Sequence, residues 1–248
     1  MADNYTAFTS PLVHAPGGLQ TSYAYRTRLG MSPSAEFDVF HEDFNTLVSS
    51  NTPTGWSSIL ETSGTWATST TYGNGVIVGT HATASNGVAI YLPKVVQLAA
   101  GKKFFMEVRV RTDDVTDNQV QFGLFDQTST SVADAPFTTT ANNLIAFGIL
   151  DGSATTKMLC DKSNSGSTAE TGTRSLVVNT WHTLGIGYDG ISAVCGYVDG
   201  NLSQTWSQAF ATTVPTGVAL SPFVAMDNGN GAGGASIFID YVRFVVER

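Results

Sequence analysis

The sequence has little charge, and the charge that it has is mostly negative. Charged residues make up 13% of the 248 residues, with 12 Lys and Arg against 20 Asp and Glu. The basic residues are scattered, so no basic stripe predicts a nucleic-acid partner. No apolar run approaches the roughly 18 residues of a membrane span, so we expect no membrane contact. The first residues carry no positive segment followed by an apolar run, so we expect no secretory signal. We therefore expect the protein to be made in a cytosol.

Cysteine is also scarce. Cys160 and Cys195 are the only two in the chain. In a reducing cytosol we expect two buried, inert thiols, with a disulfide or a reactive thiol as the alternative.

Familiar catalytic and cofactor signatures are missing as well. There is no G-x-S-x-G elbow, no phosphate loop and no dinucleotide fingerprint, and the histidines are dispersed without metal-ligand spacing. We expect no cofactor and no metal, and we expect His182 to face outward on its strand. Two oxygen-rich clusters are interpreted as solvated loop and turn residues rather than calcium ligands: Asp113, Asp114, Asp117 and Asn118, then Asp227, Asn228 and Asn230.

The clearest positive signal is the stretch from Trp181 to Trp206. Two alternating runs, 181–188 and 191–198, are separated by Asp189-Gly190, a pair suited to a two-residue type I′ turn. A second Asp-Gly pair, Asp199-Gly200, follows the next run. The stretch therefore predicts a three-stranded antiparallel meander.

Further strands are predicted along the rest of the chain, and no helical period of convincing length occurs. Residues 103–111 alternate apolar and charged side chains, as expected of a half-solvated strand. The last strand is apolar on both faces, which places it centrally, with Asp240 and Arg243 near an edge or paired. The expected strands are 37–44, 56–62, 76–80, 87–92, 104–112, 120–126, 144–150, 157–160, 218–226 and 236–246.

Residues 1–35 have a different composition, with prolines, a Gly17-Gly18 pair and several aromatic residues. Because disordered tails are usually poor in aromatic residues, we predict an extended N-terminal arm before a body at 36–248. The arm either lies on its own domain or docks on a neighbouring subunit, with simple disorder as the remaining alternative. Its expected partner-binding residues are Tyr5, Phe8, Tyr23, Tyr25, Arg26 and Arg28.

Together the segments EDFNTL, FFMEVRVR, QFGLFD, WHTLGIGYDGISAVCGYVDG and IFIDYVRF resemble a concanavalin-A/laminin-G-like jelly roll over about residues 40–247. The resemblance implies an all-β, antiparallel two-sheet sandwich whose closing strand pairs with the opening one. This fold hosts lectins, hydrolases, adhesion modules and viral structural proteins, so it does not by itself fix function.

One segment is close to a glycosidase motif. Residues 36–41, EFDVFH, nearly match the E-x-D-x-x-E signature of a laminarinase-like jelly-roll family, but His41 stands where the third acid should be. Glu42 would share a face with Glu36 and Asp38 only in a strand without a bulge. We therefore predict a polar opening strand and no catalytic residues.

Aromatic residues beside polar ones are the candidates for sugar binding, because flat rings suit sugar faces. Trp66, Tyr72, Trp206 and Tyr91 qualify, although aromatic residues on strands usually pack in the core. Trp56 and Trp181 are assigned to the core.

The arm and the polar surface resemble virion proteins of tailed bacteriophages. This implies a non-enzymatic capsid decoration (cement) protein in the virion, bound to the major capsid protein or other virion subunits and forming a homotrimer. One alternative is a carbohydrate-binding or receptor-binding tail or fibre protein, which would bind a glycan. A second alternative is a jelly-roll glycoside hydrolase or lyase, with carboxylates supplied by Glu36, Asp38 or Glu107.

Overall fold

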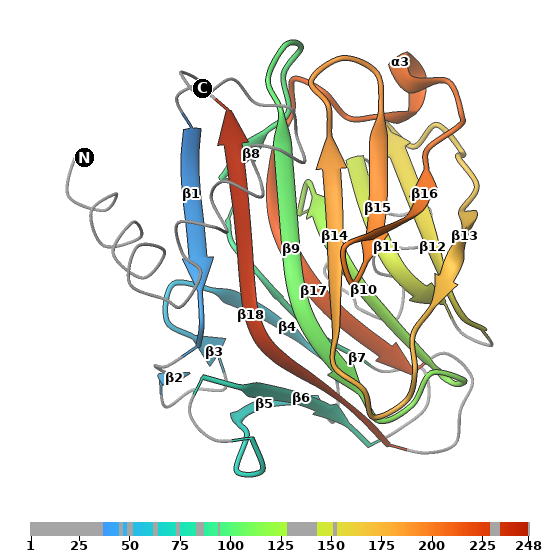
Figure 1. The fold of residues 1–248 in the computed structure, drawn as a ribbon. Coiled ribbons are helices and arrows are strands. Elements are labelled where there is room, and N and C mark those ends of the chain that lie inside the picture. Colours follow the sequence, from blue (N-terminus) through green and yellow to red (C-terminus); the bar gives the residue numbers. More distant parts are fainter. Residues whose placement is uncertain are drawn as a thin grey trace.

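Two antiparallel sheets lie face to face and form a sandwich (Figure 1). A computed structural model describes residues 37–44, 47–48, 52–61, 64–72, 75–82, 87–93, 95–127, 143–150, 153–228 and 234–247. The predicted all-β, antiparallel jelly-roll sandwich is confirmed. The predicted arm, with Tyr5, Phe8, Tyr23, Tyr25, Arg26 and Arg28, lies outside the described residues, as does Glu36.

The front sheet in Figure 1 has the strand order β16-β15-β14-β9-β18-β6-β5, with β1 also paired to β18. Its strands are β1 (Phe37–Glu42), β5 (Thr65–Thr68), β6 (Ile77–His81), β9 (Phe104–Thr112), β14 (His182–Tyr188), β15 (Val194–Val198), β16 (Asn201–Thr205) and β18 (Ala235–Glu247).

The back sheet has the order β13-β12-β11-β10-β17-β7-β4, with β8 paired to β17, and β2 and β3 form a separate ladder. These strands are β2 (Leu47–Val48), β3 (Thr52–Pro53), β4 (Ser57–Leu60), β7 (Gly87–Tyr91), β8 (Val96–Gln97), β10 (Asn118–Phe125), β11 (Asn143–Leu150), β12 (Ser153–Lys162), β13 (Glu170–Ser175) and β17 (Ala219–Asn228).

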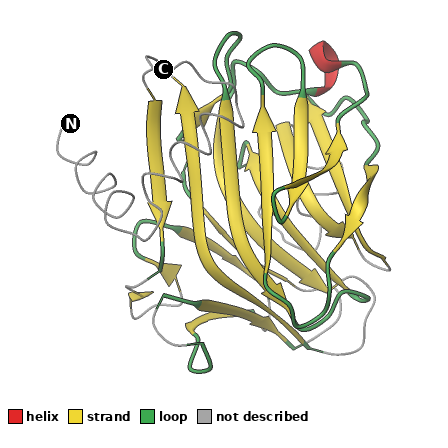
Figure 2. Ribbon diagram, viewed as in Figure 1, coloured by secondary structure: helices red, strands yellow, loops and turns green. Residues whose placement is uncertain are grey.

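Helix is nearly absent from the described residues. One short helix, α3 (Phe210–Thr213), follows β16, and strands make up most of the ribbon in Figure 2. Within the described ranges, no helix is long and apolar enough to cross a membrane.

The core fills the space between the sheets. On β9, the side chains of Phe104, Met106, Val108 and Val110 all join it, while the alternate residues face outward. The burial of four apolar side chains on one face of this strand follows the period of two that the sequence shows.

Strand β18 organises the front sheet, and its predicted central position is confirmed. One flank pairs with β9, and the other is shared between β6, opposite residues 235–239, and β1, opposite residues 242–247. The pairing of β1 with β18 also confirms the expected contact between the opening and closing strands. The ladder with β9 shifts register between Ile239 and Tyr241, so Asp240 is the extra residue of a β-bulge.

The predicted meander is present as β14, β15 and β16, but its two turns differ. Asp199 and Gly200 have φ of 49° and 78°, as a type I′ turn requires at both central positions. The prediction of the same turn at Asp189-Gly190 is wrong. There the loop spans residues 189–193, because Asp189 Oδ1 accepts hydrogen bonds from the backbone N–H groups of residues 191, 192 and 193 at 2.8–2.9 Å.

Two strands with weak alternation, β5 and β13, were not predicted from the sequence. Strand β13 is mostly exposed and polar, and β5 has one buried side chain, Trp66. Neither segment carries the periodic apolar pattern that indicates a strand.

Candidate functional site

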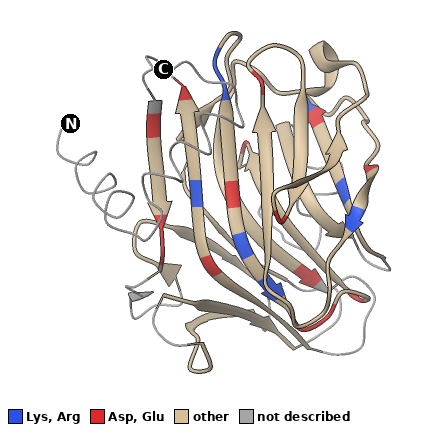
Figure 3. Ribbon diagram, in the orientation of Figure 1, with Lys and Arg blue, Asp and Glu red and all other residues tan. Residues whose placement is uncertain are grey.

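Charged and aromatic side chains gather on the outer face of the front sheet. Figure 3 shows the charges on neighbouring strands β9 and β18. We call this group the outer strip. Its members are His41 on β1; Glu107, Arg109 and Arg111 on β9; Phe238, Asp240, Tyr241 and Arg243 on β18; Trp181 just before β14; and Tyr72 after β5.

Alternation along two paired strands brings the strip together. Glu107 lies opposite Arg243 in the ladder, and Arg109 lies opposite Tyr241. The bulge at Asp240 shifts the alternation of β18, so that Phe238 and Tyr241 both reach the outer face while Ile239 stays in the core. β-Bulges are common next to functional sites because they re-aim side chains in this way.

One end of the strip is a closed network centred on Glu107. Its Oε1 atom accepts hydrogen bonds from the Tyr241 hydroxyl and from Arg243 Nε, both at 2.8 Å, and Arg243 Nη2 forms an ion pair with the same oxygen. The Glu107 side chain is only 7% exposed. A buried carboxylate oxygen held by several donors fixes the geometry around it.

The protonation of this end is set by burial. Desolvation, followed by the charge of Glu107, raises the pKa of Tyr241 to about 12, so its hydroxyl remains a hydrogen-bond donor at neutral pH. Burial, and then the Arg243 charge, lowers the pKa of His41, which stacks on Tyr241 with ring centroids 5.8 Å apart. The closed end thus favours neutral tyrosine and neutral histidine.

The other end of the strip is open. Arg109 lies over the Trp181 ring, with Cζ 4.9 Å from the ring centroid, and forms an ion pair with Asp240 through Nη1. Arg111 lies 5.1 Å from the ring centroids of both Tyr72 and Phe238. The side chain of Arg109 is 40% exposed and Tyr72 is 36% exposed, so aromatic surface and cationic donors both reach solvent.

The aromatic rings of the open end support one another. The Tyr72 ring is edge-on to both Trp181 and Phe238, with centroids 5.5 Å and 5.1 Å apart. Arg111 is also fixed, because Nε and Nη2 donate to the backbone oxygen and the side-chain Oδ1 of Asn179 at 3.0 Å and 2.6 Å. The open end is therefore ordered before any ligand arrives.

The proposed sugar-binding aromatic residues lie in different environments. Trp66 is 1% exposed and packs in the core, and Trp206 is 5% exposed and donates from Nε1 to Thr213 Oγ1 at 2.8 Å. Neither ring presents a face to a sugar. Tyr91 is half-buried and packs edge-on against Phe125. Tyr72 belongs to the strip, where its part in sugar binding stays a prediction.

The faces predicted for two residues at the start of β14 are wrong: Trp181 was expected in the core and His182 on the outer face. Leu184, Ile186 and Tyr188 face the core, so by alternation His182 also faces inward, where it is 8% exposed, and Trp181 faces outward. The outward positions of this strand are Thr183, Gly185 and Gly187, so no charged side chain marks its outer face in the sequence.

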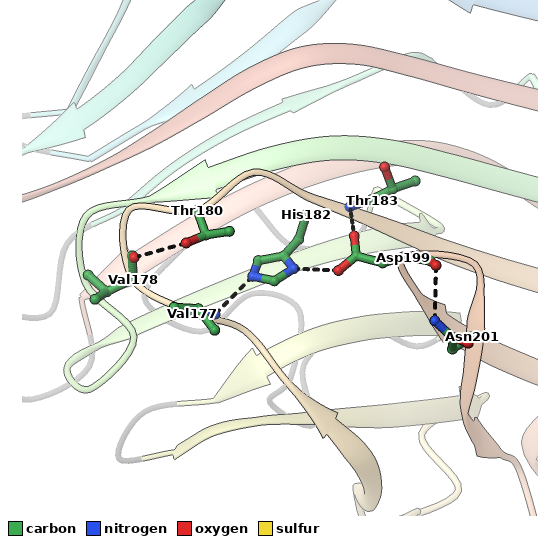
Figure 4. A network of polar contacts seen from close by, with 7 residues as sticks. All are labelled: Val177, Val178, Thr180, His182, Thr183, Asp199 and Asn201. Atoms are coloured by element: carbon green, nitrogen blue, oxygen red, sulfur yellow. Dashed lines mark hydrogen bonds and ion pairs between the residues drawn. The ribbon is translucent and has the colours of Figure 1, made fainter.

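His182 and Asp199 form a pair that resembles part of a catalytic triad, but the ring is fully engaged (Figure 4). His182 Nδ1 lies 2.8 Å from Asp199 Oδ2, and Nε2 accepts a hydrogen bond from the Val177 N–H at 2.9 Å. Asp199 Oδ1 also accepts from the Thr183 N–H. Because Nε2 already accepts a hydrogen bond from the backbone, the pair holds the loop before β14 to the hairpin after β15.

Other carboxylates considered from the sequence serve local structure. Asp38 and Glu42 alternate with His41 on β1 and so lie on the opposite face of that strand from the strip. Asp114 Oδ1 accepts from the N–H groups of Thr116 and Asp117, and Asp113 Oδ1 accepts from that of Ser236. Among the described residues, no group of three or more His, Cys, Asp or Glu side chains is arranged to hold a metal ion.

Both cysteines are free thiols. Cys160 is fully buried, and this burial raises the pKa of its thiol well above the usual value. Cys195 is half-buried, with Sγ 3.6 Å from Thr205 Oγ1, so the expectation of a buried thiol holds for Cys160 alone.

No family model and no curated protein matches the sequence. The fold is similar to a protein of unknown function from Shewanella oneidensis, with TM-score 0.60 at 14% identity over 90% of this chain and 93% of that one. It is similar to an endo-β-1,4-glucuronan lyase from the fungus Trichoderma reesei, with TM-score 0.57 at 11% identity over 83% and 94%. It is also similar to the carbohydrate recognition domain of Emp47p, with TM-score 0.54 at 13% identity over 86% and 98%.

Further structures of this fold include the Crh5 transglycosylase and a β-glucanase from Bacillus licheniformis. The chain also matches a sialidase, of whose length it spans 17%. At 9–16% identity these similarities establish the concanavalin-like jelly roll.

The comparisons contradict the prediction of a non-enzymatic capsid decoration protein. The structures named above that have a stated activity are carbohydrate-active enzymes or a carbohydrate recognition domain, and none of those named is a virion protein. The virion interpretation depended on the composition of residues 1–35 and of the surface, neither of which is specific to assembly. The prediction that the chain is not an enzyme depended on missing motifs, and a missing motif excludes only the chemistry of its own family.

Sequence reasoning did not assemble the outer strip, although one signal for it was visible. The alternation on β9 placed Glu107, Arg109 and Arg111 on one face. Two arginines on the outward face of a central strand could have marked a surface site, but their partners on β18 depend on the ladder register and the bulge.

Proposed function

We propose that this protein is carbohydrate-active and binds a glycan chain along the open end of the outer strip. The observation that carries the proposal is the array of Trp181 and Tyr72 beside Arg109 and Arg111 on one open sheet face. Aromatic rings supply flat apolar surface for a sugar ring, and guanidinium groups supply donors for its oxygen atoms.

The order of this array supports a binding role. Each arginine is held against aromatic rings and anchored by Asp240 or Asn179, so little side-chain freedom remains to be lost when a ligand binds. The closed end lies beside the array on the same two strands and holds their outward side chains in place through Glu107.

The first alternative drawn from the sequence, carbohydrate binding, is the one that these residues favour. Tyr72 is the residue shared by that prediction and by the strip. The fold is also one in which carbohydrate recognition and carbohydrate chemistry both occur, as the Emp47p domain and the glucuronan lyase illustrate.

The test is a panel of polysaccharides assayed with the full chain for both binding and cleavage. Binding is measured by calorimetry. Cleavage is followed as new reducing ends for hydrolysis, and as ultraviolet absorbance of the unsaturated sugar that a lyase forms. The proposal predicts that at least one polysaccharide is bound and that Trp181→Ala weakens this binding.

The matched control is Leu202→Ala, which removes an exposed apolar side chain from the edge strand β16. It should leave binding unchanged. If the whole panel is neither bound nor cleaved, or if both variants affect binding equally, the proposed function is wrong.

A further inference from the structure

The arginines of the open end have hydrogen-bonding capacity that the described contacts do not use. Arg109 donates through Nη1 to Asp240, and Nε and Nη2 have no partner among the described residues. Arg111 donates through Nε and Nη2 to Asn179, and its Nη1 has no partner within the described ranges. A hydroxyl of a neutral sugar accepts such bonds without charge assistance, whereas a carboxylate can accept two parallel, charge-assisted N–H bonds from one guanidinium.

The two arginines are also suitably placed relative to each other. They are two residues apart on β9 and face the same side, so their Cα atoms are roughly 7 Å apart. Each guanidinium lies near an aromatic ring, which fixes its position and leaves an edge for a ligand. A chain-like ligand lying across the rings could therefore present successive anionic groups to both.

The local charge favours an anion despite the acidity of the whole chain. The strip holds three arginines against Glu107 and Asp240, a net charge of +1, on a chain whose net charge is −8. Glu107 is paired with Arg243 inside the closed end. The open end therefore presents Arg109 and Arg111 against the single charge of Asp240.

We propose that the glycan bound by this protein contains uronic acids, whose carboxylates are received by Arg109 and Arg111 while the sugar rings lie against Trp181 and Tyr72. This inference rests on the proposed function and specifies its ligand class. Arg109 forms the stronger contact, because two of its nitrogen atoms are available, and Asp240 competes with the ligand for the third.

The test compares polyuronates with matched ligands that lack the charge. Polyglucuronate, polygalacturonate and alginate are each offered beside their methyl-esterified form, together with a neutral β-glucan. At low salt we expect at least one polyuronate to bind about tenfold more tightly than its ester, and added salt should reduce the difference.

The variants are the double substitution Arg109→Gln with Arg111→Gln and, as a control, Arg174→Gln. Arg174 is an exposed arginine on β13 in the other sheet, so both proteins lose positive charge but only one loses it at the strip. The double variant should lose about tenfold in polyuronate affinity, and the control should stay within about twofold. Arg109→Lys keeps the charge without the planar donor group, so it should give an intermediate loss of polyuronate affinity. This variant tests the inference even if the double variant fails to fold.

The outcomes separate the two proposals. Equal binding of acid and ester, lost in Trp181→Ala but not in the arginine variants, would overturn the uronate inference and leave the proposed function standing. Loss of affinity in Arg174→Gln equal to that in the double variant would overturn the uronate inference as a site-specific claim. Failure to bind or cleave any acidic or neutral glycan would overturn both.

Discussion

The two ends of the outer strip are made of similar residue types. They differ in how deeply the side chains are buried and in how many hydrogen-bond donors already have partners. At the closed end, Glu107 is 7% exposed and its Oε1 is shared by Tyr241 and Arg243. At the open end, Arg109 and Asp240 are 40% and 29% exposed, and Arg109 retains unused donors. The same β9–β18 ladder carries both ends, so the difference comes from burial.

Burial separates the charges that stabilise the fold from those that are available for a ligand. A buried ion pair is costly to break, because the remaining partner is left charged in a low-dielectric environment, whereas an exposed pair contributes little. The closed end should therefore control stability, and the open end should control binding.

The largest expected effect comes from breaking the closed end. Glu107→Gln removes the negative charge that Arg243 faces, and we expect the free energy of unfolding to fall by about 3 kcal/mol. Urea unfolding of both proteins measures this. The control is Asp117→Asn, which alters an exposed carboxylate at a loop. A loss below about 1 kcal/mol would show that the closed end does not carry the stability assigned to it.

The next effect depends on pH and concerns Tyr241. Its folded pKa of about 12 lies above the ordinary value of 10.0, so the folded state holds this proton more tightly than the unfolded state. The resulting stability is full below about pH 10 and is lost as the pH rises through about 12, by about 2 kcal/mol. Tyr241→Phe should lose less stability over that interval, as measured by urea unfolding at pH values from about 9 to 12. Parallel curves for the two proteins would contradict the assignment.

A binding effect of about tenfold is expected at the open end. Trp181→Ala removes the ring that lies under Arg109, and we expect the Kd for the bound polysaccharide to rise about tenfold, or about 1.4 kcal/mol. The free energy of unfolding should change by less than the free energy of binding, because the Trp181 side chain is half-buried on the outer face. Calorimetry gives the affinity, and thermal unfolding of the same samples gives the stability. A fall in Tm with unchanged affinity would place Trp181 in structure alone.

The smallest effect should have opposite signs for binding and for stability. Asp240→Asn breaks an exposed ion pair, so we expect about 0.5 kcal/mol of lost stability. The same change removes the negative charge that competes with the ligand for Arg109, so polyuronate affinity should rise severalfold. Measuring both quantities on one sample sharpens the contrast with Glu107→Gln, and a drop in affinity would count against competition between Asp240 and the ligand.

Much of the fold was predictable from local patterns. The alternation on β9 and the apolar closing strand were visible in the sequence, and their structural positions agree with it. The Asp199-Gly200 turn was also predictable, whereas Asp189-Gly190 was not, because the Asp189 side chain competes with the hairpin by accepting three backbone N–H groups. A dipeptide alone does not reveal such competition.

The candidate site was less predictable. Trp66 and Tyr72 are both aromatic residues in polar surroundings in the sequence, yet one is buried and the other exposed. His182 and Trp181 were assigned to the wrong faces because the outward positions of β14 hold Thr183 and two glycines, with no charged side chain to mark the solvent side. Burial of an aromatic ring depends on what packs over it from distant parts of the chain, which short-range periodicity does not encode.

Local patterns in the sequence specify the all-β class, the main strands and the alternation that turns Glu107, Arg109 and Arg111 to one side of β9. These follow from residue-by-residue preferences and from a period of two. Three features arise only in the folded chain. Arg243 contacts Glu107, the bulge at Asp240 brings Tyr241 outward, and Trp181 and Tyr72 lie beside the arginines. Those contacts join residues that are far apart in the sequence, and they depend on ladder register and burial, which the whole chain sets together.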